Sequence, residues 1–284
     1  MTRDDEPDEG PADGRGVDLL RADAPRPRRR RSVPRAHPAI PIVLGVIWLL
    51  IAYTAILVVD VAGLGQERLA EAVPDRPVMW LLLFEPSSPT ELLVWATLGV
   101  LALVSANISG RLRLRGEERP AAFWRLIGVG AVLMLMEDAG DVRYIFHQWV
   151  EIAGILADHP HQLPIVEAIW YAVIASVFAV AILRHGRAVL GSRATVVLGT
   201  VGVVAYAVAS LGSLSREVFP WYVDLGARLE ALIPGELPRP PGWHDINVHW
   251  FLTDRVFEES FELLGAVFLL AAALAYRRTV ASAT

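Results

Sequence analysis

Long apolar stretches separated by short polar ones dominate the chain. A helical apolar run of about 18 residues or more is long enough to cross the hydrocarbon core of a bilayer. Six such runs predict membrane spans over residues 39–62, 91–109, 121–150, 163–183, 194–213 and 250–276. The pattern therefore predicts an all-α protein, a polytopic membrane bundle of six transmembrane helices.

Two groups of acidic residues interrupt this apolar pattern. Each group has the same form, two adjacent acids followed by a third acid three residues later. The first triplet lies in the third predicted span and consists of Glu137, Asp138 and Asp141. The second triplet lies in the sixth predicted span and consists of Glu258, Glu259 and Glu262. Ionisable side chains within a membrane span are costly, so by default they mark a functional or structural site.

Composition supports the membrane assignment and excludes some chemistry. The mean hydropathy is +0.42 and 54% of the residues are hydrophobic, which argues against a soluble protein. The chain has no cysteine, which excludes disulfides and thiolate metal sites. It also has no lysine, so every basic side chain is arginine or histidine.

The distribution of arginine predicts the orientation of the spans. Residues 1–38 are rich in Asp, Glu, Pro, Gly and Arg without apolar periodicity, which is typical of a disordered tail. With this tail in the cytoplasm, the short loops on the same side carry most of the remaining arginines, and the opposite side is acidic. Both termini are then cytoplasmic, with a membrane domain of residues 39–278 and a short tail of residues 279–284. Both triplets then lie in the outer half of the membrane.

The segments between the spans carry weaker signals. The apolar run Val78–Phe84 is too short to cross a membrane, so we expect it in the interface with Trp80 as an anchor. Residues 217–233, within the long loop 214–247, favour an interfacial helix. In the fifth span, small residues repeat at every fourth position from 205 to 213, which favours close helix packing.

Helical periodicity predicts which side chains share a face. In a continuous third helix, Glu137 and Asp141 share one stripe with Tyr144 and Gln148. In the sixth helix, Arg255 shares an arc with the second triplet. Such faces are costly in lipid, so we expect the two triplets to form two walls of one site.

Three functions remain open for this site. The carboxylates outnumber the arginines, so the site could bind a divalent cation or carry protons in coupled transport. The candidate metal ligands are Glu137, Asp141, Glu258, Glu259 and Glu262. The acids could instead serve structure alone, paired with Arg143 and Arg255. A metal-dependent enzyme acting at the outer face is the third possibility.

Four further residues lie at the periphery of the predicted site: Asp138, His147, Glu167 and His249. Imidazole beside carboxylate is a common ligand set for zinc or iron, and His249 directly precedes the sixth span. The histidines show no tight metal-binding spacing, however, so histidine does not decide between the three functions.

The chain resembles a group of uncharacterised bacterial multi-pass membrane proteins in two short segments. These are MEDAGDVRY at residues 136–144 and FEESFELLGA at residues 257–266. In that group an Asp-Glu pair is followed by His-Glu, and a later span carries Glu-Glu-x-x-Glu-x-x-Gly. Arg143 and Tyr144 stand here where His-Glu would be, which weakens a metal site and favours charge pairing. The resemblance implies a multi-pass protein of a bacterial inner membrane. The group has no assigned activity, so the resemblance implies no reaction.

Signatures of other functions are absent from the sequence. There is no Walker A loop, no GxSxG, no HExxH and no GxGxxG ahead of a helix. The only dense basic run lies in the N-terminal tail, so we expect no nucleic-acid partner. The sequence thus predicts a membrane protein whose partner is the lipid bilayer and whose outward-facing acidic site binds a cation or serves transport. Whether it is an enzyme stays open.

Overall fold

The computed structural model describes residues 36–74, 77–154, 163–216, 219–240 and 242–282. The regular structure of these residues is entirely helical, and six helical segments are long and apolar enough to cross a membrane. These segments are Ala39–Val61, Met79–Arg113, Glu118–Gly140, Ala168–Val189, Arg193–Ser215 and Asp245–Val280. The prediction of an all-α protein with six such helices is confirmed.

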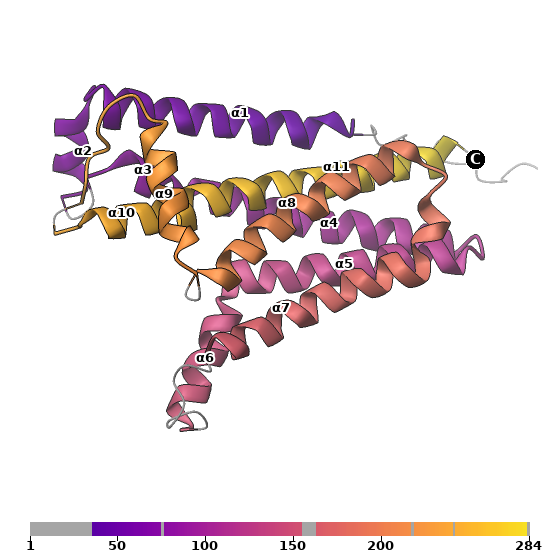
Figure 1. Ribbon diagram of the computed structural model, residues 1–284. Helices are drawn as coiled ribbons and strands as arrows, with labels where there is room; N and C mark the ends of the chain where they lie inside the picture. The colour runs from indigo at the N-terminus through magenta and orange to yellow at the C-terminus, as the bar shows by residue number, and fades with distance from the viewer. Residues whose placement is uncertain (1–35, 75–76, 155–162, 217–218, 241, 283–284) are drawn as a thin grey trace, which may run out of the picture. The chain divides into compact units, whose positions relative to one another are not determined.

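Figure 1 shows the α-helices. Several of them continue into π-helical or 3-10 segments, which we name η. The first half contains α1 (Ala39–Ala55), η2 (Ile56–Val61), α2 (Gln66–Ala72), α3 (Met79–Phe84), α4 (Pro89–Arg113), α5 (Glu118–Gly140) and α6 (Val142–Ile152). The second half contains α7 (Leu163–Val180), η4 (Ala181–His185), η5 (Gly186–Val189), α8 (Arg193–Ser215), α9 (Trp221–Ala231), α10 (Asp245–Phe251), η6 (Leu252–Phe257) and α11 (Glu258–Ser282).

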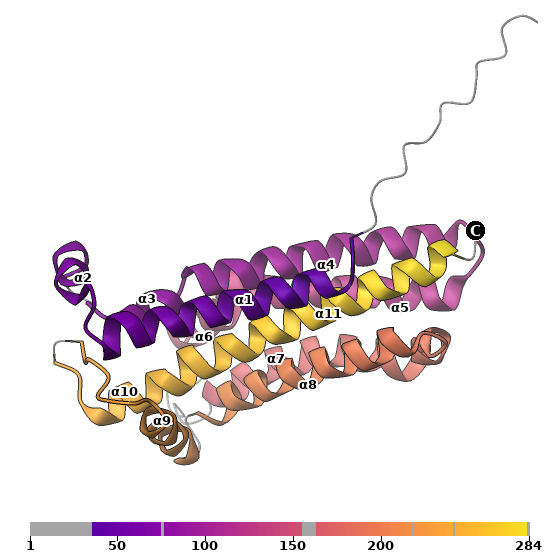
Figure 2. The same ribbon diagram turned by 90° about the horizontal axis from the view of Figure 1, so that it is seen from above.

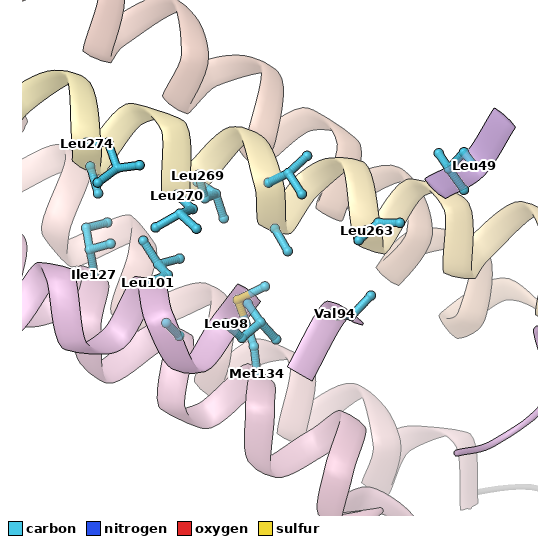
Figure 3. Close-up of a cluster of buried hydrophobic side chains, with 14 of the residues drawn as sticks. Leu49, Val94, Leu98, Leu101, Ile127, Met134, Leu263, Leu269, Leu270 and Leu274 are labelled. Atoms are coloured by element: carbon cyan, nitrogen blue, oxygen red, sulfur yellow. The ribbon is translucent and has the colours of Figure 1, made fainter. Parts of the chain in front are cut away.

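Helix α11 is the central element of the bundle. It packs against α8, α4 and α1, and its span is by far the most buried of the six (Figures 1 and 2). Leucines along one side of α11 meet Leu98 and Leu101 of α4 and Met134 of α5 (Figure 3). Between helices in lipid, such contacts act mainly through van der Waals packing. A central helix of this kind can present polar groups to several neighbours at once.

Small residues bring α8 close to α11. Gly202, Ala205, Ala209 and Ser213 are all buried on the same face of α8, as the repeat of small residues predicts. A Cβ atom at Gly202 would lie only 2.9 Å from the backbone nitrogen of Leu269. The predicted close approach of this helix is therefore confirmed, and α11 is its partner.

The third span is shorter than predicted. Helix α5 ends at Gly140, and Asp141 adopts a left-handed conformation with φ 44° and ψ 38° before α6 begins. Figure 1 shows α6 leaving the bundle at a sharp angle to α5. The continuous helix to residue 150 was therefore wrong. Asp141 no longer shares a stripe with Tyr144 and Gln148, because a left-handed residue breaks the helical periodicity.

Short helices gather at one end of the bundle. The start of α1 and the end of α11 lie at the opposite end (Figures 1 and 2).

Helix α3 is short, as predicted, and the Asp60 carboxylate accepts hydrogen bonds from the backbone nitrogens of Met79 and Trp80, both at 2.8 Å. Trp80 is fully buried, so its assignment as an interfacial anchor was wrong.

The two predicted tails have different outcomes. Residues 1–35 of the N-terminal tail lie outside the described residues. At the other end α11 continues to Ser282, so residues 279–282 are helical where the sequence predicted a tail.

Candidate functional site

The turn η6 divides the second triplet between two groups of neighbours. This π-helical segment directly precedes α11, and π-turns recur at functional sites because they shift the direction of the side chains that follow. Glu258 contacts residues of α8 and α9, whereas Glu259 interacts with charges on α4 and α5. The single arc predicted for the second triplet therefore does not describe one site.

The first group, which we call the Tyr222 network, consists of Arg216, Tyr222, Asp254 and Glu258. The buried Tyr222 hydroxyl lies 2.9 Å from Oε1 of Glu258 and 3.1 Å from Oδ1 of Asp254. One hydroxyl proton therefore serves two buried carboxylates. Hydrogen bonds to charged acceptors are among the stronger ones in proteins. The Tyr222 hydroxyl therefore connects α9 to the end of η6 and the start of α11.

Two arginines balance the charge of Asp254. The Arg216 guanidinium lies 3.3 Å from Oδ1, and Nε of Arg255 lies 3.0 Å from Oδ2. The Arg255 contact is ionic only, because its N–H does not meet hydrogen-bond geometry. Arg216 also stacks over the Trp250 ring at 5.9 Å from its centroid. Arg255, which we expected to pair with acids of the triplets, thus has an ion pair with Asp254, which lies outside both triplets.

Local structure explains how these side chains meet. Pro220 precedes the first turn of α9 and starts the helix, which places Tyr222 on its buried face. Thr253 of η6 donates a hydrogen bond of 2.8 Å to the Tyr222 carbonyl. On α8, a Cβ atom at Gly212 would lie 2.6 Å from Oε1 of Glu258, so glycine leaves the space that this carboxylate occupies.

The environment of Tyr222 keeps its hydroxyl protonated. Burial raises the pKa of Tyr222 far above its ordinary value, and the negative charges of Glu258 and Asp254 raise this pKa further. Exposed tyrosines ionise near pH ~10. The Tyr222 hydroxyl thus remains a hydrogen-bond donor throughout the physiological range.

The second group, which we call the Glu259 cluster, consists of Glu91, Asp138, Arg255 and Glu259. Glu259 is 7% exposed and interacts electrostatically with Glu91 of α4 and Asp138 of α5. Asp254 adds a third negative charge, and Arg255 supplies the positive one. Within the described part of the chain, Oε2 of Glu259 is buried without a hydrogen-bond partner. Such an oxygen is costly to bury while the carboxylate is charged.

Neighbouring helices hold the other members of this cluster. The Tyr206 hydroxyl of α8 donates to Oδ2 of Asp138 at 3.1 Å. Gly265 of α11 leaves space for the Tyr206 ring, because a Cβ atom at this position would lie 2.5 Å from the ring. Glu91 lies in the first turn of α4, where its carboxylate accepts a hydrogen bond from the Ser87 backbone nitrogen and the Ser88 hydroxyl caps the helix.

The proposed metal ligands do not come together in the structure. No group of three or more His, Asp or Glu side chains that could hold a metal ion occurs among the residues described. Asp141 is exposed at the break between α5 and α6, while Glu137 is buried in the last turns of α5. His249 pairs with Glu230 of α9 at 2.7 Å, so it belongs to a different contact.

Several predicted site residues have no structural outcome. The side chains of Arg143, Tyr144, His147 and Glu167 lie outside the described residues. Glu262 is half-buried on α11, and its charge acts on Tyr206. Asp138 of the first triplet and Glu259 and Glu262 of the second thus all act on Tyr206, and Asp138 also interacts with Glu259.

The structure adds residues that the sequence analysis did not select. Glu91, Asp254, Tyr206 and Tyr222 all contribute to the two groups. Glu91 and Asp254 are acidic residues near the start of predicted spans. They could have been selected by the same criterion as the triplets, the cost of an ionisable side chain in a membrane span. The tyrosines carry no such signal, because an aromatic residue in an apolar helix is most often a packing residue.

Comparison with known proteins gives no match: no protein-family model, curated protein or solved structure is similar to the chain.

Proposed function

We propose that this chain is an integral membrane protein in which the Glu259 cluster binds and releases a proton, as the cation site of a transport-related function. One observation carries the proposal. Oε2 of Glu259 is buried without a partner in the described part of the chain, among three other carboxylates and one arginine. Protonation removes the charge that this environment disfavours.

The charges around Glu259 come from three helical elements. Glu91 lies on α4, Asp138 on α5, and Asp254 and Arg255 on η6, while Tyr206 of α8 donates to Asp138. Asp254 also belongs to the Tyr222 network, which extends to the partly exposed Arg216. The network offers a polar connection between Glu259 and the end of the bundle.

Infrared difference spectroscopy between buffers of about pH 6 and about pH 9 tests the proposal, because exposed Asp and Glu side chains, with a pKa of about 4, stay ionised across this range. A carboxyl group that gains a proton shows a C=O stretching band that the carboxylate lacks. We expect such a band in the wild type and its loss in Glu259→Gln, which keeps the shape of the side chain but cannot titrate. Glu67→Gln, at an exposed position of α2, is the matched control and should keep the band. A band that persists unchanged in Glu259→Gln contradicts the proposal.

A metal titration separates the proton from a divalent cation. A ligand at a hundredfold excess over its Kd stabilises a protein by about 2.7 kcal/mol. We expect Ca²⁺ and Zn²⁺ to leave the melting temperature in detergent unmoved, because no three-ligand group is preformed among the described residues. A metal-dependent rise that disappears in Glu262→Gln would support the divalent cation instead.

A further inference from the structure

A cavity of about 340 Å³ lies on another side of α11 and its preceding turn. Residues of α1 and η2 form one wall, α9 and the segment after it form a second, and η6 with the start of α11 forms the third. Its volume falls in the range of about 300–1,000 Å³ that is typical of small-molecule sites. Neither group of acidic residues contributes a side chain to its lining.

The lining of this cavity is apolar. Its walls include Leu57, Leu229, Leu252, Val256 and Phe261. The few polar atoms already have partners: the Tyr53 hydroxyl lies 2.7 Å from the Ser260 hydroxyl, which donates to the Val256 carbonyl at 2.6 Å.

The indole nitrogen of Trp80, a further lining residue, donates to the Pro238 carbonyl at 3.4 Å. Apolar cavities do not retain water and accept apolar guests. The apolar lining therefore favours a ligand whose buried part carries no polar groups.

The cavity reaches the apolar surface of α1. Leu57 and Leu232 line it, yet they are 44% and 81% exposed. Leu50 and Val58 on the same first span are also exposed and apolar, so the surface beside Leu57 is continuous with the face that α1 turns to the acyl chains of a bilayer. The most abundant apolar ligand at that face is the bilayer itself.

We propose that this cavity holds one acyl chain of a bilayer lipid. The chain enters between η2 and the segment after α9, and its headgroup stays at the membrane surface. Burial of the chain adds apolar contact at Leu229, Leu252 and Val256, which α9 and η6 provide. A seated lipid would therefore join α1 to the elements that carry the Tyr222 network.

Photolabelling in vesicles tests the proposal. The full chain is reconstituted in phosphatidylcholine vesicles that contain a phosphatidylcholine with a photoreactive group near the end of one acyl chain, and labelled residues are identified by mass spectrometry. We expect labels on lining residues of α9 and η6. Leu57→Trp and Leu229→Trp, which fill the cavity from two different walls, should lower this labelling several-fold. Val58→Trp, next to Leu57 and 40% exposed but not in the lining, is the matched control and should leave it unchanged.

Two outcomes would overturn the proposal. The first is labelling restricted to outward-facing residues such as Leu103 of α4, which is 73% exposed, with none on α9 or η6. The second is cavity labelling that neither Leu57→Trp nor Leu229→Trp reduces.

Discussion

At the scale of single residues, Tyr222 connects more charged groups than any other uncharged side chain of the site. Its hydroxyl lies within hydrogen-bond distance of two carboxylates from η6 and α11, and its carbonyl accepts a bond from Thr253. Without this donor, Asp254 and Glu258 would face each other with one fewer hydrogen bond each. The side chain therefore stabilises two buried charges at once.

We expect Tyr222→Phe to lower the free energy of unfolding by about 3 kcal/mol, because a hydrogen bond to a buried charge contributes about 1.5–3 kcal/mol. Tyr53→Phe is the matched control, since it removes one bond to the neutral Ser260 hydroxyl and should cost about 1 kcal/mol. Unfolding in mixed micelles with increasing SDS measures both. Equal losses in the two variants would mean that the charged acceptors add nothing.

At the scale of elements, the junction of α9 with α10 positions the Tyr222 network. Gly226 is buried in the middle of α9, and a Cβ atom there would overlap the carbonyl oxygen of His249. The same carbonyl also accepts a bond from Thr253 at 3.3 Å. The His249–Glu230 pair closes the junction one turn further along α9. A glycine is required here because two backbones meet without space for a side chain.

Substitution of this glycine should separate the two helices. We expect Gly226→Ala to lower the melting temperature strongly, with a cost on the order of 3 kcal/mol, because the backbone of α10 cannot move aside as a flexible side chain would. Gly199→Ala on α8 is the control. Its Cβ atom would lie 3.8 Å from that of Ala272, an ordinary contact, so this variant should be neutral or slightly stabilised. Equal melting temperatures for the two variants would contradict the close approach.

At the scale of the whole molecule, six apolar helices are compatible with an integral membrane protein. The beginning of α1 and the end of α11 lie at one end of the bundle, and α2, α3, α9 and α10 lie at the other (Figure 1). Arg111, Arg113, Arg187 and Arg193 flank the loops at the former end. By the positive-inside rule, we expect this arginine-rich end to lie in the cytoplasm.

Reporter fusions test this orientation. Alkaline phosphatase, which is active only outside the cytoplasm, should be active when fused within residues 219–240. A fluorescent protein that matures only in the cytoplasm should fluoresce when fused after Arg278. The reverse pattern would invert the protein in the membrane and place both acidic groups on the cytoplasmic side. Activity of the phosphatase at both positions would require an odd number of spans.

The sequence by itself determined the class of this protein. Apolar runs such as residues 39–62 and 194–213 produce helices in lipid regardless of their neighbours, because every backbone polar group must be satisfied within its own segment. The repeat of small residues also predicted which face of α8 packs closely, since only small side chains permit two helices to approach so closely. The sequence also marked the acids of the two triplets as costly positions, and two of them, Asp138 and Glu259, interact electrostatically in the structure.

Only the tertiary structure decided which acids share a site. The left-handed Asp141 ends α5 and the π-turn η6 shifts the phase of α11, and both break the regular rotation on which face predictions depend. Glu258 then accepts a hydrogen bond from Tyr222 of a loop-connected helix, and Glu259 interacts electrostatically with Glu91 of a helix far away in the chain. These contacts depend on how whole helices pack, which local periodicity does not encode. The apolar cavity has the same origin, because four segments that are separate in the sequence line it.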